Sequence, residues 1–148
     1  MLSKSSEYAI RAVVYIMAHA SETERISIEA VCKAIGTPRH FTAKLLQTLS
    51  RKGIISSAKG PNGGFNIDPN AEEISLESVV EAIDGGNVFN GCILGLSACS
   101  EDHPCPLHHQ YKGIRAQLKN MLQCQSIRQL AERTEAGDSF VNNREPAA

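Results

Sequence analysis

Apolar residues recur every three or four positions along the first fifty residues, and this pattern predicts three helices. The first is expected over residues 5–20. The second follows Ser27, whose hydroxyl can cap a helix, and ends at Gly36. The third follows Thr37, which offers a capping hydroxyl before a proline, and extends to residue 52. Two short helices joined by a glycine-containing turn indicate a helix-turn-helix.

Two short β-prone runs come after the third helix. Residues 54–58 and 65–68 flank the turn-forming sequence KGPNGG, which predicts a β-hairpin. A hairpin directly after a helix-turn-helix is typical of a wing. A fourth helix is then expected from the cap Ser75 to the stop signal Asp84-Gly85-Gly86.

A longer apolar stripe begins near residue 107. Leu107, Tyr111, Ile114, Leu118 and Met121 follow the alternating spacing of a coiled-coil seam. The stripe covers two heptads, and a helix packed against its own domain would need the same stripe. We interpret it as a dimerisation helix, because helix-turn-helix proteins usually contact two DNA half-sites through two-fold symmetry.

These elements predict a mainly α (α+β) fold, a winged helix-turn-helix with a long C-terminal dimerisation helix. We divide the chain into a DNA-binding region over residues 1–70, a second region with dimerisation helices over 71–134, and a flexible tail over 135–148. A short helix at residues 127–132 is expected to pack back on the domain.

Composition fits one domain of 148 residues with a sizeable core, since 42% of the residues are hydrophobic. Glu7 and Arg11 interrupt the apolar N-terminal segment, so that segment predicts neither a signal peptide nor a membrane span. We therefore expect a cytoplasmic protein with no membrane partner. No phosphate-binding loop, catalytic triad order or nucleophile elbow is present, so we do not expect an enzyme.

The net charge of −1 conceals two halves of opposite sign. Residues 1–67 hold nine Lys and Arg against four Glu, a charge of +5, and residues 68–148 hold six Lys and Arg against twelve Asp and Glu, a charge of −6. Uneven charge on solvated faces would give the same numbers. Beside a helix-turn-helix, however, the basic half favours double-stranded DNA as the partner.

The third helix divides into an apolar inward face and a polar outward face, and the outward face is expected to include Thr42. Its N-terminal residues are the candidates for base contacts, those further along for phosphate contacts, and the glycine-rich wing for close approach to the backbone or minor groove. The predicted DNA-binding residues are Arg39, His40, Ala43, Lys44, Gln47, Arg51, Lys59, Pro61, Asn62 and Gly63.

The segment NGCILGLSACSEDHPCPLHHQY, residues 90–111, holds three of the five cysteines and three of the five histidines. An odd number of cysteines argues against a disulfide framework and favours thiolate chemistry. Three thiolates and one imidazole would form a soft four-ligand site, suited to zinc or to an iron–sulfur cluster, and the spacing does not separate the two.

Two other functions fit the same residues. The spacing also matches a CCCH zinc finger that binds RNA, but the stretch from Cys92 to His109 has no aromatic residue to stack on bases and no Lys or Arg. Cysteines that sense thiol oxidation without a metal are the other alternative. In either case the chain would contain the same helix-turn-helix.

From Ser3 to about Glu132 the chain resembles the bacterial winged-helix repressors typified by IscR and NsrR. The resemblance rests on SSEYAIRAVVYIMAHA, on RKGIISSAKGPNGGF, on ISLESVVEAIDG and on the three cysteines. It implies a homodimeric repressor on a palindromic operator, controlled by an iron–sulfur cluster that responds to redox state, nitric oxide or iron. Of the two cluster types in these repressors we expect [2Fe–2S] rather than [4Fe–4S].

The resemblance implies that Cys92, Cys99 and Cys105 are the thiolate ligands. The fourth ligand would be His108 in an IscR-like site, or Glu7 of the partner subunit in an NsrR-like site. We favour His108, because imidazole is a ligand of other clusters and because it lies within one turn of Cys105 if that cysteine begins the helix. The six residues between the first two cysteines depart from both patterns.

Overall fold

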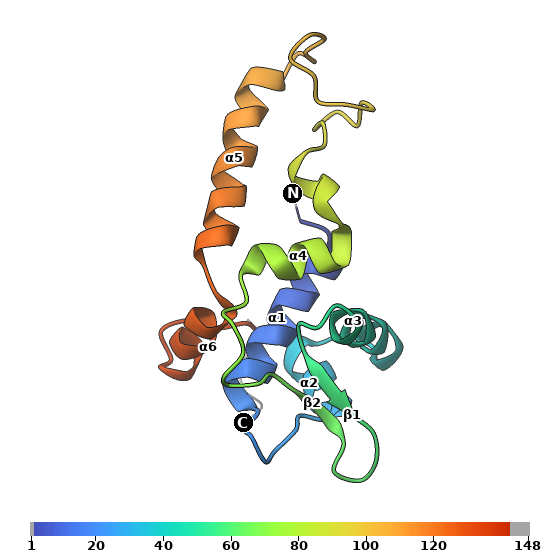
Figure 1. Cartoon of the computed structure of the whole chain (residues 1–148), viewed down its shortest axis with the longest axis vertical. Helices are drawn as coiled ribbons and strands as arrows, with labels where there is room; N and C mark the ends of the chain where they lie inside the picture. The colour runs from blue at the N-terminus through green and yellow to red at the C-terminus, as the bar shows by residue number, and fades with distance from the viewer. Residues whose placement is uncertain (1, 143–148) are drawn as a thin grey trace.

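The computed structural model describes residues 2–142, which form six α-helices, one 3-10 helix and one two-stranded sheet (Figure 1). The elements in chain order are α1 (Lys4–His19), α2 (Ile28–Ile35), α3 (Arg39–Arg51), β1 (Ser56–Ala58), β2 (Gly64–Asn66), α4 (Leu76–Asp84), η1 (Gly86–Phe89), α5 (His108–Cys124) and α6 (Ile127–Glu135). The predicted mainly α winged helix-turn-helix is confirmed. Within residues 2–142, no helix is both long and apolar enough to span a bilayer.

Helix α1 lies at the centre of the predicted DNA-binding region and packs against α2, α3, α4 and α6 (Figure 1). Five of its apolar side chains are completely buried: Ala9, Ala12, Val13, Val14 and Ile16. Burial of such a stripe supplies the main stabilising free energy of a small domain. The same packing fixes α3 relative to the rest of the fold.

Local capping signals set the ends of α2 and α4. The Ser27 hydroxyl accepts a hydrogen bond from the backbone N–H of Ala30, and Gly36 ends α2 in the left-handed conformation at φ 69°. Ser75 caps α4 in the same way. These positions match the sequence predictions, because a helix cap depends on residues close together in the chain.

The start of α3 differs from the prediction. Pro38 is the N-cap residue, and no side chain caps the helix. The Thr37 hydroxyl instead lies 2.6 Å from that of Thr42, which donates a hydrogen bond to the Pro38 carbonyl at 3.0 Å. Thr42 is fully buried, so the prediction that it lies on the outward face of α3 is wrong. The hydrogen bonds to Thr37 and Pro38 satisfy its polar group inside the protein.

The wing is a short antiparallel hairpin in which β1 pairs with β2, with Ser57 opposite Phe65. Phe65 also exchanges backbone hydrogen bonds with Ile26, which anchors the wing to the segment before α2. Gly64 has φ 138°, and a Cβ atom there would lie 2.6 Å from the Ile26 carbonyl oxygen. Only glycine fits this close backbone contact.

Helix α5 extends away from the DNA-binding region, and α6 returns to pack against α1 (Figure 1). The α5 helix begins at His108, with Leu107 as N-cap residue, so Cys105 lies before the helix rather than at its first position. Its C-terminal part packs on the core through Leu118 and Leu122. Reciprocal backbone hydrogen bonds beside Ser75 and Ser126 then join the starts of α4 and α6.

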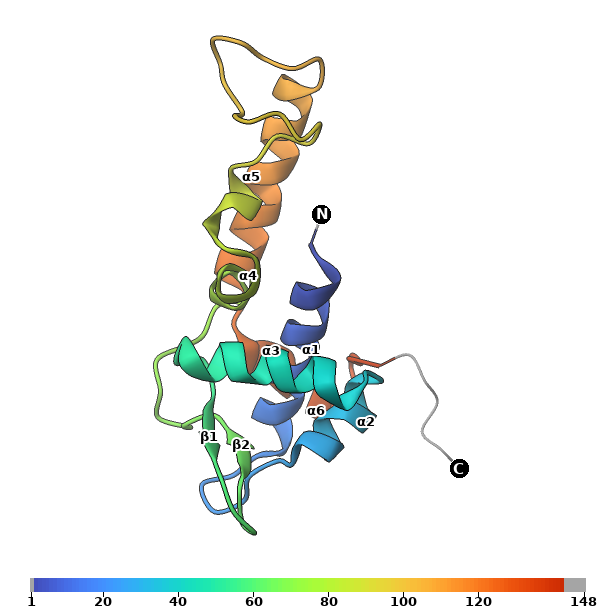
Figure 2. The ribbon, with the colours of Figure 1, turned by 90° about the vertical axis from the view of Figure 1, so that its right-hand side faces the viewer.

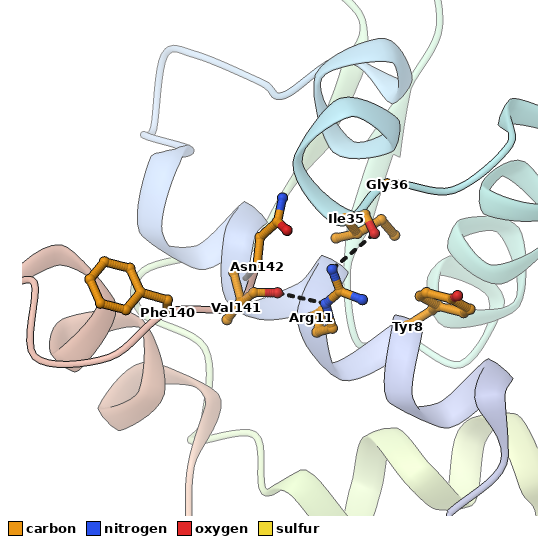
Figure 3. A pocket seen from close by; sticks show the side chains of 7 residues that line it. All are labelled: Tyr8, Arg11, Ile35, Gly36, Phe140, Val141 and Asn142. Carbon is orange, nitrogen blue, oxygen red and sulfur yellow. Dashed lines mark hydrogen bonds between the residues drawn. The ribbon is translucent and has the colours of Figure 1, made fainter. Parts of the chain in front are cut away.

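Residues 140–142, part of the predicted tail, lie against α1 and α2 around a cavity of about 580 Å³ (Figure 3). The Arg11 guanidinium donates hydrogen bonds to the carbonyl oxygens of Val141 at 2.6 Å and Ile35 at 2.9 Å. The Asn142 side chain donates to the Ala34 carbonyl at 2.8 Å. Arg11 thus satisfies a carbonyl at the end of α2 and holds the tail. Residues 143–148 lie outside the described residues, and the three-region division stays a prediction.

Substitution of Arg11 by methionine is expected to lower the free energy of unfolding by about 1–3 kcal/mol, because two partly buried carbonyls lose a charged donor. Methionine keeps the apolar stem that packs beside Tyr8. Urea denaturation followed by circular dichroism measures the change. The control Lys33→Met removes a cation from an exposed site on α2 and should change stability by less than about 0.5 kcal/mol. Equal effects of the two substitutions would contradict the assigned role of Arg11.

Candidate functional site

The outward face of α3 and the wing form two adjoining hollows. A hollow of about 510 Å³ is lined in part by five predicted DNA-binding residues, Ala43, Lys44, Gln47, Arg51 and Lys59. A second hollow of about 480 Å³ is lined in part by three more, Arg39, Pro61 and Gly63. His40 and Asn62 are exposed near them on the same two elements. The fold therefore brings the predicted residues from two separate sequence segments to one basic surface.

Arg39 has a partner that the sequence did not predict. Its Nε atom lies 3.0 Å from Oε1 of Glu29 on α2. A hydrogen bond from the Glu29 backbone N–H and then the Arg39 guanidinium hold the pKa of the Glu29 carboxyl below its ordinary value. The ion pair places a negative charge beside the predicted base-contacting residues.

The cysteine loop, defined here as residues 90–107, lies at the opposite end of the molecule from the wing (Figure 1, Figure 2). Arg115 of α5 donates a hydrogen bond to the Gly91 carbonyl at 2.7 Å and fixes the start of the loop. Three large apolar side chains of the loop, Ile93, Leu94 and Leu96, are about half exposed. Leu107 of the loop and the α5 residues Ile114 and Met121 are also large exposed apolar side chains.

Two of the four predicted ligands, Cys99 and His108, are in contact. The Cys99 Sγ atom is 3.3 Å from Nδ1 of His108. Backbone N–H groups of Leu96 and then Leu94 lower the pKa of Cys92, and the Cys105 thiol acts in the same direction. None of these cysteines forms a disulfide in the described part of the chain. Within residues 2–142 the structure therefore brings Cys99 and His108 together, but no three of the four predicted ligands have their ligand atoms within 4.8 Å of one another. A thiolate beside an imidazole is a donor pair that suits a metal.

A different set of side chains surrounds the far edge of the His108 ring. Glu101, His108 and His109 have ligand atoms within 4.8 Å of one another, the only such group of three His, Cys, Asp or Glu side chains within residues 2–142. Glu101 also pairs with Lys112, and this contact is the main cause that lowers the pKa of the Glu101 carboxyl. The ammonium group opposes a metal ion at Glu101. Sequence reasoning gave Glu101 and Lys112 no role.

The alternative fourth ligand, Glu7, lies in the first turn of α1, where its carboxylate is 2.8 Å from the Lys4 ammonium group. Within one subunit, His108 rather than Glu7 is therefore the residue paired with a loop cysteine. The spacing argument for His108 assumed that Cys105 begins α5, which is wrong. The Cys105 carbonyl nevertheless accepts a hydrogen bond from the His108 N–H at 3.0 Å, so a single tight turn keeps the two residues close.

Residues 2–133 match the Rrf2 family, whose description is iron-dependent transcriptional regulator. The chain belongs to the Rrf2 family. It is 28% identical over 132 residues to a protein of Aquifex aeolicus inferred to be an HTH-type transcriptional regulator, covering 88% of this chain and 90% of that one. It is 23% identical over 144 residues to the HTH-type transcriptional regulator IscR of Pectobacterium atrosepticum, covering 97% and 80% of the two chains.

A solved Rrf2-like fold also matches. CymR, the global cysteine regulator of B. subtilis, superposes with a TM-score of 0.69 at 18% identity, over 89% of this chain and 96% of that one. At this identity the match shows the fold. Because members of the Rrf2 family are transcriptional regulators, this chain is a transcriptional regulator and not an enzyme.

Proposed function

We propose that this Rrf2-family regulator is a homodimeric, cytoplasmic repressor that binds a palindromic operator under the control of an iron–sulfur cluster. The cluster ligands would be Cys92, Cys99, Cys105 and His108. The observation that carries the proposal is the contact of Cys99 Sγ with His108 Nδ1 at 3.3 Å. Cys92 and Cys105, the other two thiols, belong to the same loop. The description of the family as iron-dependent supports the proposal.

The contact of Cys99 with His108 favours a [2Fe–2S] cluster over a [4Fe–4S] cluster, because two ligands that lie together can bind one iron. A [2Fe–2S] cluster takes two protein ligands on each iron, whereas each iron of a [4Fe–4S] cluster takes one. Cys92 with Cys105 would serve one iron, and Cys99 with His108 the other. The backbone N–H groups that stabilise the Cys92 thiolate would also stabilise its bond to iron. Bound there, the cluster would supply a one-electron redox centre.

Contacts along α5 connect the cysteine loop to the DNA-binding region. Arg115 holds the start of the loop, and Lys119, one turn further on, lies 3.7 Å from the Glu77 carboxylate of α4 and 6.0 Å from the Phe89 ring centroid. Helix α4 in turn packs against α1 and α3. A rearrangement of the loop would therefore shift α5 against α4 and change the relative position of the two α3 helices of a dimer.

DNA binding would use the basic surface of α3 and the wing. Arg39, His40, Ala43 and Lys44 would face base edges, while Gln47, Arg51 and the wing residues Lys59, Pro61, Asn62 and Gly63 would contact the backbone. The exposed apolar side chains of α5, Ile114 and Met121, would pack against those of a second subunit. Two such surfaces related by a two-fold axis would match a palindromic operator.

A cluster-free thiol sensor is the second candidate. The lowered pKa of Cys92, caused mainly by backbone N–H groups and in part by the Cys105 thiol, would favour a reactive thiolate and disulfide formation between these two cysteines. In that case the purified protein would be colourless, and peroxide would oxidise this pair in preference to the exposed Cys124. The zinc-bound CCCH alternative would also be colourless, but it would contain zinc.

The experiment is anaerobic purification with iron and sulfide counts and a visible spectrum, followed by measurement of binding to promoter DNA. We expect two irons and two sulfides per subunit, and a change in operator affinity of at least tenfold between the loaded and the apo protein. Fluorescence anisotropy against competitor duplex measures the affinity. Colourless protein with zinc or no metal would refute the cluster, and failure of every form to prefer any promoter would refute the DNA-binding function.

Substitution of Glu29 by glutamine is expected to raise the affinity for duplex DNA about two- to fivefold. The substitution removes a negative charge at the DNA-binding surface and releases Arg39 from an exposed ion pair of about 0–1 kcal/mol. Anisotropy titrations at fixed salt measure the change. The control Glu132→Gln removes the same charge from an exposed position on α6, a helix that packs on α1 rather than on α3. If both substitutions have the same effect, the gain comes from net charge and not from Arg39.

A further inference from the structure

His108 is the most buried polar side chain near the cysteine loop, with 3% of its surface exposed. Its two ring nitrogens face different partners. Nδ1 lies 3.3 Å from the Cys99 sulfur, and Nε2 lies 3.4 Å from Oε2 of Glu101. Within the described residues, Nε2 is buried without a well-aligned hydrogen bond, although the carboxylate oxygen is close. A buried polar nitrogen is costly unless it has a partner, and Glu101 is the group positioned to provide one.

Lys112 fixes the position of the Glu101 carboxylate. Lys112 lies four residues after His108, one turn along the same face of α5, and its ammonium group contacts Oε1 of Glu101. The second oxygen of the same carboxylate then faces the His108 ring. The loop residue Glu101 is thus held between two residues of α5. It is a hydrogen-bond acceptor in this position rather than a metal ligand, because the neighbouring ammonium group repels a cation.

We propose that Glu101 is a positioning residue that accepts the Nε2 proton of His108 and thereby makes Nδ1 the ligand atom beside Cys99. The inference rests on the proposed function, since it concerns the ligand that His108 offers to the cluster. A neutral imidazole carries one proton on one of two nitrogens. A carboxylate at Nε2 stabilises the tautomer with the proton there, and the lone pair of Nδ1 then points toward the sulfur side.

The expected consequence is tighter retention of the cluster. Metal-bound histidines commonly donate their second N–H to a carboxylate, which orients the ring and makes it a better ligand. Loss of such an outer partner commonly weakens metal binding roughly 10–100-fold. Lys112 would contribute indirectly, by holding Glu101 in place, so its removal should have a smaller effect in the same direction.

The experiment compares wild type with Glu101→Ala, Lys112→Gln and the control Asp102→Ala. Asp102 neighbours Glu101 in the loop, so its substitution removes the same charge. Two readouts are taken. Long-range ¹H–¹⁵N NMR of the apo protein identifies which nitrogen of His108 carries the proton, and the visible spectrum follows loss of the reconstituted cluster to an iron chelator under anaerobic conditions.

In the wild type and in Asp102→Ala we expect the proton on Nε2 and slow cluster loss. In Glu101→Ala the proton should move to Nδ1, where the Cys99 sulfur can accept it, and cluster loss should be about 10–100 times faster. Lys112→Gln should lie between these values, and it serves as the test if Glu101→Ala does not fold. A coloured wild type with unchanged tautomer and unchanged loss rate in both variants overturns the inference. A colourless wild type instead refutes the proposed function.

Discussion

Substitution of Cys99 by alanine is expected to abolish the visible absorbance of the anaerobically purified protein and to reduce bound iron and sulfide from two of each per subunit to almost none. Cys99 is the thiol that faces His108, so its loss would leave one iron with a single protein ligand. Three ligands cannot hold a [2Fe–2S] cluster that needs four. Iron and sulfide assays with the spectrum measure the effect, and the operator affinity of the variant should equal that of the apo protein.

Cys124 provides a matched control for this substitution. It is exposed at the end of α5. Its thiol donates a hydrogen bond to Oδ1 of Asn120 at 3.7 Å, far from the cysteine loop in the chain. Cys124→Ala should therefore leave the colour, the iron content and the response of DNA binding unchanged. If Cys99→Ala keeps its colour, Cys99 is not a ligand, and the pairing of donors at the loop has another purpose.

Short-range features of this fold could be predicted from the sequence. Ser27, Gly36 and Ser75 act on backbone groups only a few residues away, so their types and positions were sufficient to predict the ends of α2 and α4. The wing followed from its turn residues for the same reason. The start of α3 was misjudged because the Thr37 hydroxyl had a competing partner, Thr42, that becomes available only when both are buried.

Features that depend on the path of an irregular loop could not be predicted. The spacing of the cysteines identified the candidate ligands but not their pairing, since a loop of this length has many conformations. Glu101 and His108 are separated by six residues that include two prolines, and no periodic pattern indicates that they meet. The position of Lys112 beside His108 could have been predicted, because residues four apart on a helix share a face.

Substitution of Ile114 by glutamate is expected to produce a monomer and to weaken operator binding by about 10²–10⁴-fold. Ile114 lies in the middle of α5, and about half of its surface is exposed. Met121 and the loop residues Ile93, Leu94 and Leu96 are exposed to the same extent. Leu118 and Leu122 pack on the core of their own subunit instead. The predicted apolar stripe of α5 therefore has two parts. Leu118 packs within its own subunit, whereas the exposed residues Ile114 and Met121 are available to contact a second chain.

The size of the effect follows from two linked half-sites. When one subunit of a dimer binds its half-site, the other is held at a high effective concentration beside the second half-site, and a monomer loses this gain. A buried carboxylate in the seam would be unpaired and would meet its symmetry mate, so the interface should separate. Analytical ultracentrifugation at micromolar concentration measures the assembly, and anisotropy with a full palindrome and a single half-site measures the binding.

Ala116→Glu is the matched control, because Ala116 is exposed on α5 half a helical turn from the seam and the substitution adds the same charge. This variant should remain a dimer and keep the affinity of the wild type for the palindrome. Circular dichroism should show the same helix content in both variants, since both sites are exposed in the single chain. Dimeric Ile114→Glu, or a monomeric wild type that still prefers the palindrome to the half-site, would mean that α5 does not form the interface. The cluster signal would then have to reach the DNA-binding region within one subunit, through α4 alone.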